Sequence, residues 1–364
     1  MEHPENDDLY RGLKVNKGVA DVPTVNPYLK KKLRREYTPS EFVEGILKGN
    51  ITILSQAVTL VESAKYEHQQ IAQEIIEKCL PHAGKSVRIG ITGVPGAGKS
   101  TSIDAFGMHL IKEGRKLAVL AIDPSSERSK GSILGDKTRM EALSREKNAF
   151  IRPSPSAGSL GGVARKTRET IVLCEAAGFD TVFVETVGVG QSETAVHSMV
   201  DFFLLIQLAG TGDELQGIKR GIMEMADGII INKADGDNID KAKLAAAQFK
   251  NALHLFPPDD SGWFPKVLTY SGYYNLGIKE IWDMVGEYME FTKKNGYFDY
   301  KRNEQAKYWM YESINDTLRE TFYHNPAVES MLSSTEQQVL KNEISSFVAA
   351  KRMMDLFLEN LSKK

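Results

Sequence analysis

The most informative residues of the sequence are nine in a row. They read Gly93-Val94-Pro95-Gly96-Ala97-Gly98-Lys99-Ser100-Thr101, and the first eight match the pattern G-x-x-x-x-G-K-[S/T]. The glycines let backbone N–H groups wrap a phosphate, and the N-terminus of a following helix adds a favourable partial charge. Lys99 would reach the β- and γ-phosphates of a nucleotide, and the Ser100 hydroxyl would bind Mg²⁺. The apolar run 87–92 before the pattern and the helical segment after it favour this interpretation over a structural glycine-rich turn.

A second pattern, Asn232-Lys233-Ala234-Asp235, directly follows the apolar run 228–231. Asp235 could accept hydrogen bonds from both guanine N1–H and the exocyclic amine, while adenine offers no matching donors. Asn232 could bond the base edge from the other side, and the stem of Lys233 could lie along the ring. The pair Ser271-Gly272, which follows the apolar run 266–270, is a weaker candidate for a loop near the base. Together with the phosphate pattern, these residues predict a guanine nucleotide site.

A third motif, Glu185-Thr186-Val187-Gly188, ends the apolar run 181–186. Guanine nucleotide hydrolases commonly have D-x-x-G here, where the acid orders the magnesium shell and the glycine N–H senses the γ-phosphate. Position 189 is Val, where a water-orienting Gln commonly stands, so we expect slow basal hydrolysis. A residue from elsewhere could position the water instead. The candidates are Gln191, Asp123, Asp136 and Lys219.

Two polar, glycine-containing loops could change conformation with the nucleotide. Asp123 and Asp136 bracket the first loop, 124–135, which could order around Mg²⁺ and the γ-phosphate. The second loop, 211–221, is glycine-rich, carries both charge signs and could be a further switch. Ordinary connecting loops are the alternative for both. We therefore predict catalytic roles for Lys99, Glu185, Asp123 and Asp136, and a Mg²⁺ site built from Ser100, Asp123, Asp136 and Glu185.

Short β-rich runs, most of their residues apolar, alternate with helical stretches through the middle of the chain. They are 87–92, 117–122, 181–186, 202–208, 228–231 and 266–270. Continuous rather than alternating apolar runs are typical of strands buried on both faces of a parallel sheet. The pattern predicts an α/β fold with a doubly wound, mostly parallel sheet and helical extensions at both ends. We expect an N-terminal arm and helical segment over 1–84, a nucleotide-binding domain over 85–295 and a C-terminal helical extension over 296–364.

Helix signals mark the two extensions. Thr38-Pro39-Ser40-Glu41 is a good helix start, and helical patterning runs from there to Cys79 with a break at Gly49-Asn50. In the C-terminal part, Ala306, Met310, Ile314 and Leu318 recur every four residues. The capping box Ser334-Thr335-Glu336-Gln337 predicts the start of a further helix, which carries Leu340, Ile344, Phe347, Met354 and Leu358 on one stripe.

Composition excludes several function classes. The chain has 364 residues, with 46 Lys and Arg against 48 Asp and Glu, so no basic field suggests nucleic-acid binding. Its longest apolar run, 117–122, is far shorter than the roughly 20 residues of a membrane span. The two cysteines, Cys79 and Cys174, rule out a disulfide framework, and the scattered histidines show no zinc spacing. The acidic N-terminus lacks the layout of a targeting peptide, so we expect a cytoplasmic protein.

Four segments, 93–101, 121–126, 185–193 and 212–219, resemble the MeaB/ArgK family of methylmalonyl-CoA mutase-associated P-loop GTPases. The resemblance runs from about residue 40 to the C-terminus. It implies a homodimeric GTPase chaperone, joined through its C-terminal helices, that gates cofactor loading of an adenosylcobalamin-dependent acyl-CoA mutase and protects or reactivates it. By matching motifs, Asp123, Asp136 and Glu185 are implied as magnesium or switch acids. Asp213 and Lys219 are implied as a mutase-responsive switch, with Gln216 in the same partner-coupling segment.

Other functions stay open at this point. A metallochaperone GTPase for a nickel or cobalt enzyme usually displays Cys or His clusters, which this sequence lacks. A small-molecule kinase could use the same P-loop but would not need N-K-x-D. A structural protein that binds GTP without turnover is compatible with Val189. No D-x-H-x-x-G segment is present, so we expect no directly bound cobalamin.

Overall fold

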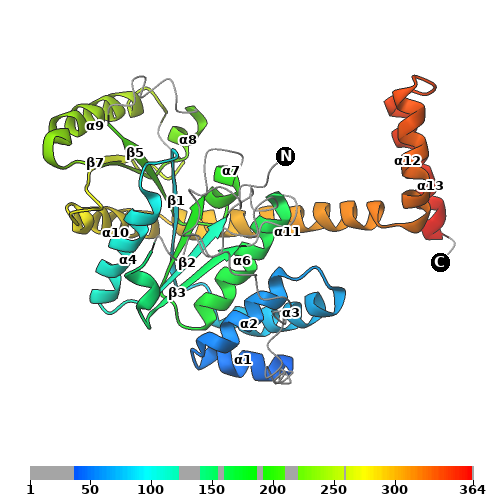
Figure 1. Ribbon diagram of the computed structural model, residues 1–364, viewed down its shortest axis with the longest axis horizontal. Coiled ribbons are helices and arrows are strands. Elements are labelled where there is room, and N and C mark those ends of the chain that lie inside the picture. Colours follow the sequence, from blue (N-terminus) through cyan, green and yellow to red (C-terminus); the bar gives the residue numbers. More distant parts are fainter. Residues whose placement is uncertain are drawn as a thin grey trace, which may run out of the picture. The chain divides into compact units, whose positions relative to one another are not determined.

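The computed structural model describes residues 37–122, 140–154, 160–186, 192–209, 220–257 and 260–362. The chain divides into two units, Met1–Thr38 and Pro39–Lys364. All the helices and strands below belong to the second unit (Figure 1). The predicted N-terminal arm, 1–36, lies outside the described residues.

The centre of this unit is a parallel sheet in the order β3-β2-β4-β1-β5-β6-β7. The strands are β1 (Val87–Gly93), β2 (Leu117–Ile122), β3 (Ala149–Ser154), β4 (Thr181–Thr186), β5 (Phe202–Leu208), β6 (Gly228–Asn232) and β7 (Lys266–Thr269). Every pairing between neighbouring strands is parallel. This confirms the predicted doubly wound sheet, and the six predicted strands end within one residue of the observed ones. Strand β1 lies at the point where the chain changes direction across the sheet, between β4 and β5.

The sequence did not predict β3, which pairs only with β2 at the edge of the sheet. Its apolar run ends at Arg152, and Pro153 cannot donate a hydrogen bond to a neighbouring strand. A proline is tolerated in an edge strand because one side of such a strand has no partner strand. The short run therefore lacked the apolar pattern of the six predicted strands.

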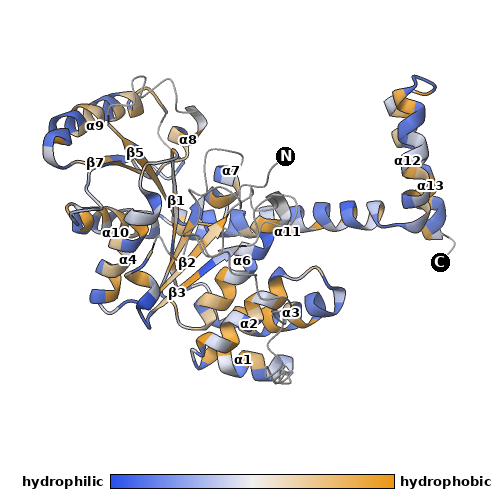
Figure 2. Cartoon of the chain, in the orientation of Figure 1, coloured by the Kyte–Doolittle hydropathy of each residue, from blue (hydrophilic) through white to orange (hydrophobic). Residues whose placement is uncertain are grey.

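Helices cover both faces of the sheet. Helices α4 (Lys99–Lys112) and α10 (Ile278–Lys294) pack on one face, where Ile89 and Ile91 of β1 join a large buried cluster. Alternate residues point to the other face, so Leu205 and Ile231 pack with α8 (Arg220–Glu224) and α9 (Ile239–Leu253). Helices α6 (Leu160–Ala176) and α7 (Ser192–His197) also lie on that second face. The strands are the most hydrophobic part of the cartoon, as expected for strands buried on both sides (Figure 2).

Of the helices before the sheet, the first two begin where the sequence predicts, whereas the break at 63–65 and the separate third helix after it were not predicted. These helices are α1 (Pro39–Leu47), α2 (Ile51–Glu62) and α3 (Tyr66–Cys79). The Asn50 side chain caps α2 by accepting from the N–H groups of Thr52 and Ile53. Helices α2 and α3 both pack against α6. Cys79 and Cys174 are free and buried, and burial raises the pKa of both thiols.

The C-terminal part consists of α11 (Tyr297–Tyr323), α12 (Pro326–Leu340) and α13 (Ser346–Ser362). The predicted helix start at Ser334 is wrong, because Ser334 and Thr335 lie inside α12 and their hydroxyls bond back to the carbonyl of Met331. The real cap is Asn325, whose side chain accepts from the Ala327 N–H. Ile344 falls in the turn before α13, so the predicted apolar stripe is divided between two helices.

Candidate nucleotide site

The predicted phosphate loop connects the end of β1 to the start of α4. Two of its glycines are required by close approaches. A Cβ on Gly93, which has φ +155, would lie 2.2 Å from the Ile206 carbonyl oxygen on β5. A Cβ on Gly98, which has φ +85, would lie 2.6 Å from Nδ2 of Asn232. The loop is therefore packed against both β5 and the predicted guanine motif, and only glycine fits at these two positions.

The Lys99 amine folds back over the loop that precedes it. It donates to the carbonyl oxygen of Gly93 at 2.8 Å and to that of Val94 at 3.4 Å. Burial lowers the pKa of Lys99, and the carboxylates of Glu185 and Glu193 oppose this shift. The cation is thus held inside the loop that would wrap the phosphates. Its carbonyl partners are neutral groups that a bound phosphate could replace.

Two of the predicted magnesium residues lie together beside this loop. The Ser100 hydroxyl donates to Oε1 of Glu185 at 3.3 Å. Glu185 is buried near the end of β4, the strand next to β1. A hydroxyl and a carboxylate are the oxygen ligands that Mg²⁺ prefers, so this pair fits a magnesium ion. Within the described ranges, no group of three or more His, Cys, Asp or Glu side chains forms a ready-made metal site.

Asn232 joins three loops at the end of β6. Its buried amide donates through Nδ2 to the Ala97 carbonyl at 2.7 Å. Its Oδ1 accepts from the N–H groups of Lys233 at 2.7 Å and Gly272 at 3.2 Å. The sequence suggested a bond from Asn232 to the base edge. In the structure the side chain bridges the phosphate loop, its own motif and the loop after β7, and its bond to the base stays a prediction.

Two of the predicted base-reading residues, Asp235 and Ser271, are hydrogen-bonded to each other. Asp235 is half-buried, and its Oδ2 accepts a hydrogen bond from the Ser271 hydroxyl. Ser271 is fully buried and also accepts from the Tyr274 N–H at 3.3 Å. Lys233 is exposed and has φ +59, and its carbonyl accepts from Asn238 Nδ2 at 2.7 Å. The structure therefore brings the N-K-x-D motif and the weaker Ser271-Gly272 candidate together.

One acid beside the phosphate loop was not among the predicted site residues. Glu193 is 2% exposed at the start of α7, and its charge acts on the Lys99 amine. The sequence shows Glu193 only as an acid eight positions beyond Glu185, a spacing with no chemical pattern of its own. The influence of Glu193 on the Lys99 pKa depends on how α7 packs on the sheet, which a local pattern does not reveal.

Other predicted residues lie outside the described residues. They are Asp123, Asp136, Gly188, Asp213, Gln216 and Lys219. Their roles in magnesium binding and switching remain predictions.

No described helix is both long enough and apolar enough to cross a membrane.

Seven parallel strands, a phosphate loop after β1 and an N-K-x-D loop after β6 define a P-loop protein of the guanine nucleotide class. A model of the family described as "Methylmalonyl Co-A mutase-associated GTPase MeaB" matches residues 54–327. The chain belongs to this family and is therefore a GTPase. This confirms the family expected from the motifs.

Two curated relatives and one solved structure illustrate the similarity. The GTPase ArgK of Escherichia coli is 45% identical over 310 residues, covering 85% of this chain and 94% of that protein. The mouse protein named methylmalonic aciduria type A homolog, mitochondrial, is 45% identical over 323 residues, covering 86% of this chain and 78% of its own length. The crystal structure of a protein named LAO/AO transport system kinase has a TM-score of 0.70 at 38% identity, covering 90% of this chain and 99% of that one.

Proposed function

We propose that this GTPase is a chaperone of an adenosylcobalamin-dependent acyl-CoA mutase, with methylmalonyl-CoA mutase as the first candidate. Its nucleotide state would gate loading of the cofactor and protect or reactivate the mutase. The family's description names a mutase-associated GTPase, and this membership supports the proposal. The observation that supports the nucleotide-dependent part of the proposal is Asn232, which ties the phosphate loop to the guanine motif and to the loop after β7.

The residues of the site support binding and slow hydrolysis of GTP. The Lys99 amine would exchange its carbonyl partners for β- and γ-phosphate oxygens, and the backbone N–H groups of the loop would bind the same phosphates. Asp235 would read the guanine edge. Ser100 and Glu185 would hold Mg²⁺, together with Asp123 and Asp136, and the ion would supply charge stabilisation at the phosphates. Val189 offers no group to orient water, which supports slow turnover without a partner.

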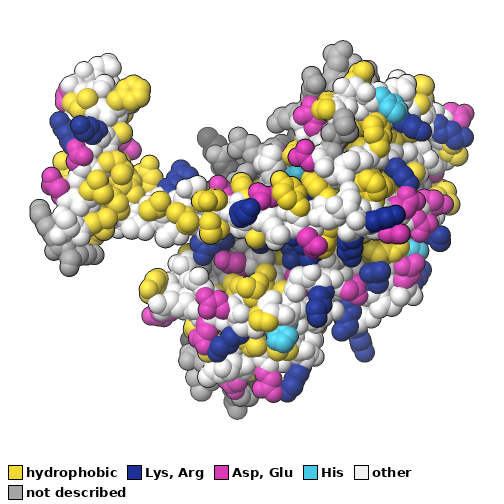
Figure 3. Space-filling view, turned by 180° about the vertical axis from the view of Figure 1, so that it is seen from behind, with side chains coloured by type: hydrophobic (Ala, Val, Ile, Leu, Met, Phe, Trp, Pro, Cys, Tyr) yellow, Lys and Arg dark blue, Asp and Glu magenta, His cyan; other side chains and the backbone are white. Residues whose placement is uncertain are grey.

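We further propose that the C-terminal extension, 296–364, joins two copies of the chain. Apolar side chains are exposed along the outer half of α11, and Figure 3 shows hydrophobic atoms gathered on this helix and on the helices at its end. Tyr311 is 61% exposed and Leu318 is 60% exposed. A cavity of about 780 Å³ opens between α11, α12 and α13, with Phe322, Leu332 and Met353 in its lining. A second copy would remove this apolar surface from water.

The remaining proposals concern the partners of the protein and its location in the cell. We propose that Asp213, Gln216 and Lys219 respond to the mutase as a switch, that cobalamin stays with the mutase, and that the protein works in the cytoplasm. A metallochaperone role is less well supported, because the described residues contain no cluster of metal-binding side chains. A kinase role is suggested only by the name of one similar protein of known structure, and the guanine motif favours GTP.

The proposal is tested by measuring GTP hydrolysis with and without a purified adenosylcobalamin-dependent mutase from the same organism, with ATP as the control nucleotide. We expect slow GTP-specific turnover that rises when the mutase is added. GTP hydrolysis that does not change when the mutase is added would be consistent with the GTPase activity and would reject the mutase as a partner. Equal hydrolysis of ATP would reject the role of Asp235 in guanine recognition. Sedimentation of the same sample tests the proposed dimer separately.

A further inference from the structure

Helix α11 contacts the nucleotide-binding domain at the carboxyl end of α7. The Nε2 of Gln305 donates to the Val200 carbonyl at 2.8 Å and to the His197 carbonyl at 3.4 Å. The indole Nε1–H of Trp309 donates to the Ser198 carbonyl at 3.0 Å. The last carbonyls of a helix have no partners within the helix and need donors from elsewhere. Two side chains of α11 therefore supply donors at the end of α7 and in the turn that follows it.

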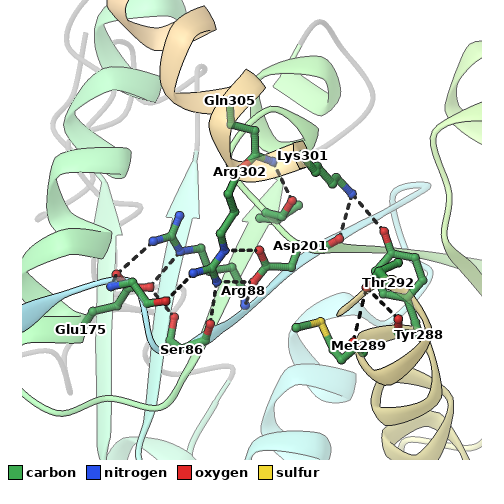
Figure 4. A network of polar contacts seen from close by, with 12 residues as sticks. Ser86, Arg88, Glu175, Asp201, Tyr288, Met289, Thr292, Lys301, Arg302 and Gln305 are labelled. Atoms are coloured by element: carbon green, nitrogen blue, oxygen red, sulfur yellow. Dashed lines mark hydrogen bonds and ion pairs between the residues drawn. The ribbon is translucent and has the colours of Figure 1, made fainter. Parts of the chain in front are cut away.

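These two side chains are fixed in place. Gln305 and Trp309 are each 6% exposed. One turn earlier on α11, Arg302 forms a two-pronged ion pair with Asp201, with both N···O distances at 2.8 Å. Lys301 donates to the Asp201 backbone carbonyl at 2.8 Å. Figure 4 shows Lys301, Arg302 and Gln305 reaching from α11 toward this segment and toward the start of β1.

The other end of α7 is buried, with Ser192 and Glu193 each 2% exposed. The charge of Glu193 opposes the lowering of the Lys99 pKa by burial. Between the two ends, α7 and its following turn pack against β1. A Cβ on Gly90 would lie 2.9 Å from Val196 and 3.0 Å from Val200. Because α7 has six residues and is only about 9 Å long, a shift at one end moves the other.

We propose that Gln305 and Trp309 are positioning residues of the nucleotide site. By holding the carboxyl end of α7, they keep Glu193 beside Lys99 and fix α7 on the strand that carries the phosphate loop. Helix α11 continues from these residues to Tyr323 and packs against α12, so movement of the C-terminal helices reaches the nucleotide through this contact. The inference uses only nucleotide binding and does not depend on the proposed mutase partner.

The test is a double-mutant cycle read out as the Kd for GDP. The first variant is Gln305→Met with Trp309→Phe, which removes both donors and keeps the volume and the aromatic ring. We expect its affinity for GDP to fall about 3- to 10-fold, as for the loss of one or two hydrogen bonds. The matched control is Lys307→Ala, which lies between the two residues on α11 but is exposed and forms an ion pair with Glu304 on its own helix. It should bind GDP as the wild type does.

The second half of the cycle repeats both substitutions in a Glu193→Gln background. If α11 acts through Glu193, the substitutions should cause little further loss there. An equal loss in both backgrounds would show a general structural effect and overturn the proposal. Unchanged affinity in the first variant would also overturn it. Thermal unfolding is measured for every variant. If the double substitution does not fold, Gln305→Met alone is carried through the same cycle.

Discussion

At the amino-terminal edge of the sheet, Arg88 on β1 bonds Glu175 through Nε at 2.8 Å and Nη2 at 3.0 Å. At the carboxyl edge of the same strand, Lys99 bonds to carbonyl oxygens of its own loop. The first edge pairs buried charges with each other (Figure 4). The second gives its cation neutral partners that a ligand could replace. The comparison separates charges that hold the fold together from a charge that is available for chemistry.

The same contrast applies to the polar groups around each edge. Glu175 also accepts from the Ser86 hydroxyl and the Gly84 N–H, both at 2.6 Å, so its two oxygens are fully used within the fold. At the other edge, Asn232 ties loops together and leaves Asp235 half-buried beside Ser271. Substitutions at the amino edge should therefore lower stability with little effect on ligand affinity. Substitutions at the carboxyl edge should lower ligand affinity with little effect on stability.

The largest expected effect is on stability, at Glu175. Glu175→Ala would leave the Arg88 guanidinium buried without its carboxylate and would remove the negative charge nearest to Arg168. We expect the free energy of unfolding to fall by about 3–5 kcal/mol, as for other broken buried ion pairs. Urea unfolding measures this loss, and the Kd for GDP should change less than about twofold in folded protein.

Glu169→Ala is the matched control on the same helix. Glu169 pairs with Arg165 at 3.1 Å, four residues away, and both side chains are partly exposed. Such pairs contribute about 0–1 kcal/mol. A loss as large as that of Glu175→Ala would contradict the special role of the amino edge.

The next effect is on nucleotide affinity, at Lys99. Lys99→Ala should weaken binding of GDP and GTP by more than about 100-fold, or ~3 kcal/mol, because the phosphates lose their cation. Calorimetric titration measures the affinity, and the unfolding midpoint should remain close to that of the wild type. Lys112→Ala, at the far end of α4, is the control and should bind normally. Retained micromolar affinity in Lys99→Ala would count against the phosphate-loop assignment.

Base discrimination should respond more weakly. Asp235→Asn removes a charged acceptor, so affinity for GTP should fall by about 10- to 150-fold, equivalent to about 1.5–3 kcal/mol. Preference should shift toward xanthine nucleotides, whose ring offers a matching acceptor. Competition between GTP, xanthosine triphosphate and ATP measures this shift. Asp237→Asn, two residues further on and exposed, should leave the order of preference unchanged.

Most of the strands were predictable because their residues are buried on both faces, whereas the edge strand β7 is only partly buried. Leu117–Ile122 is apolar at every position, and β2 has those bounds. The edge strand β3 was missed because it has a neighbouring strand on one side only and therefore tolerates Arg152 and Pro153. The capping box at Ser334 failed because the same residue types also occur inside helices, where their hydroxyls bond a carbonyl one turn back. Local patterns identify an element more reliably than they identify its ends.

The motifs of the site were predictable because phosphate and guanine recognition require fixed spacings. The motif alone does not give the role of Asn232, since its main partner, Ala97, lies 135 positions away in the sequence. Glu193 was missed for the same reason, because only the packing of α7 places it near Lys99. The amino-edge network has no motif at all. Arg88, Glu175 and Asp201 are isolated charges in the sequence, and only the fold brings them together.

The smallest expected effect is the pH dependence of stability, which should be seen as a fall in the free energy of unfolding at acid pH. Burial alone would raise the pKa of Glu175, but hydrogen bonds and charge from Arg88, with bonds from Ser86 and Gly84, hold it below its ordinary value. A carboxyl whose pKa is lower in the folded state stabilises the protein above its unfolded pKa and loses this contribution as pH falls. We therefore expect the Glu175 contribution to be complete at neutral pH and to fade below about pH 4.3.

Glu169 gives the opposite sign on the same helix. Burial raises the pKa of its carboxyl, with Arg165 opposing the shift, so Glu169 favours the folded state more as pH falls. Urea unfolding across pH 3–7 should therefore show a shallower acid loss in Glu175→Gln and a steeper one in Glu169→Gln, each relative to the wild type. Equal slopes in both variants would mean that the acid sensitivity arises elsewhere. A shallower loss in Glu175→Gln together with a steeper one in Glu169→Gln would assign part of the acid sensitivity to these two carboxyls.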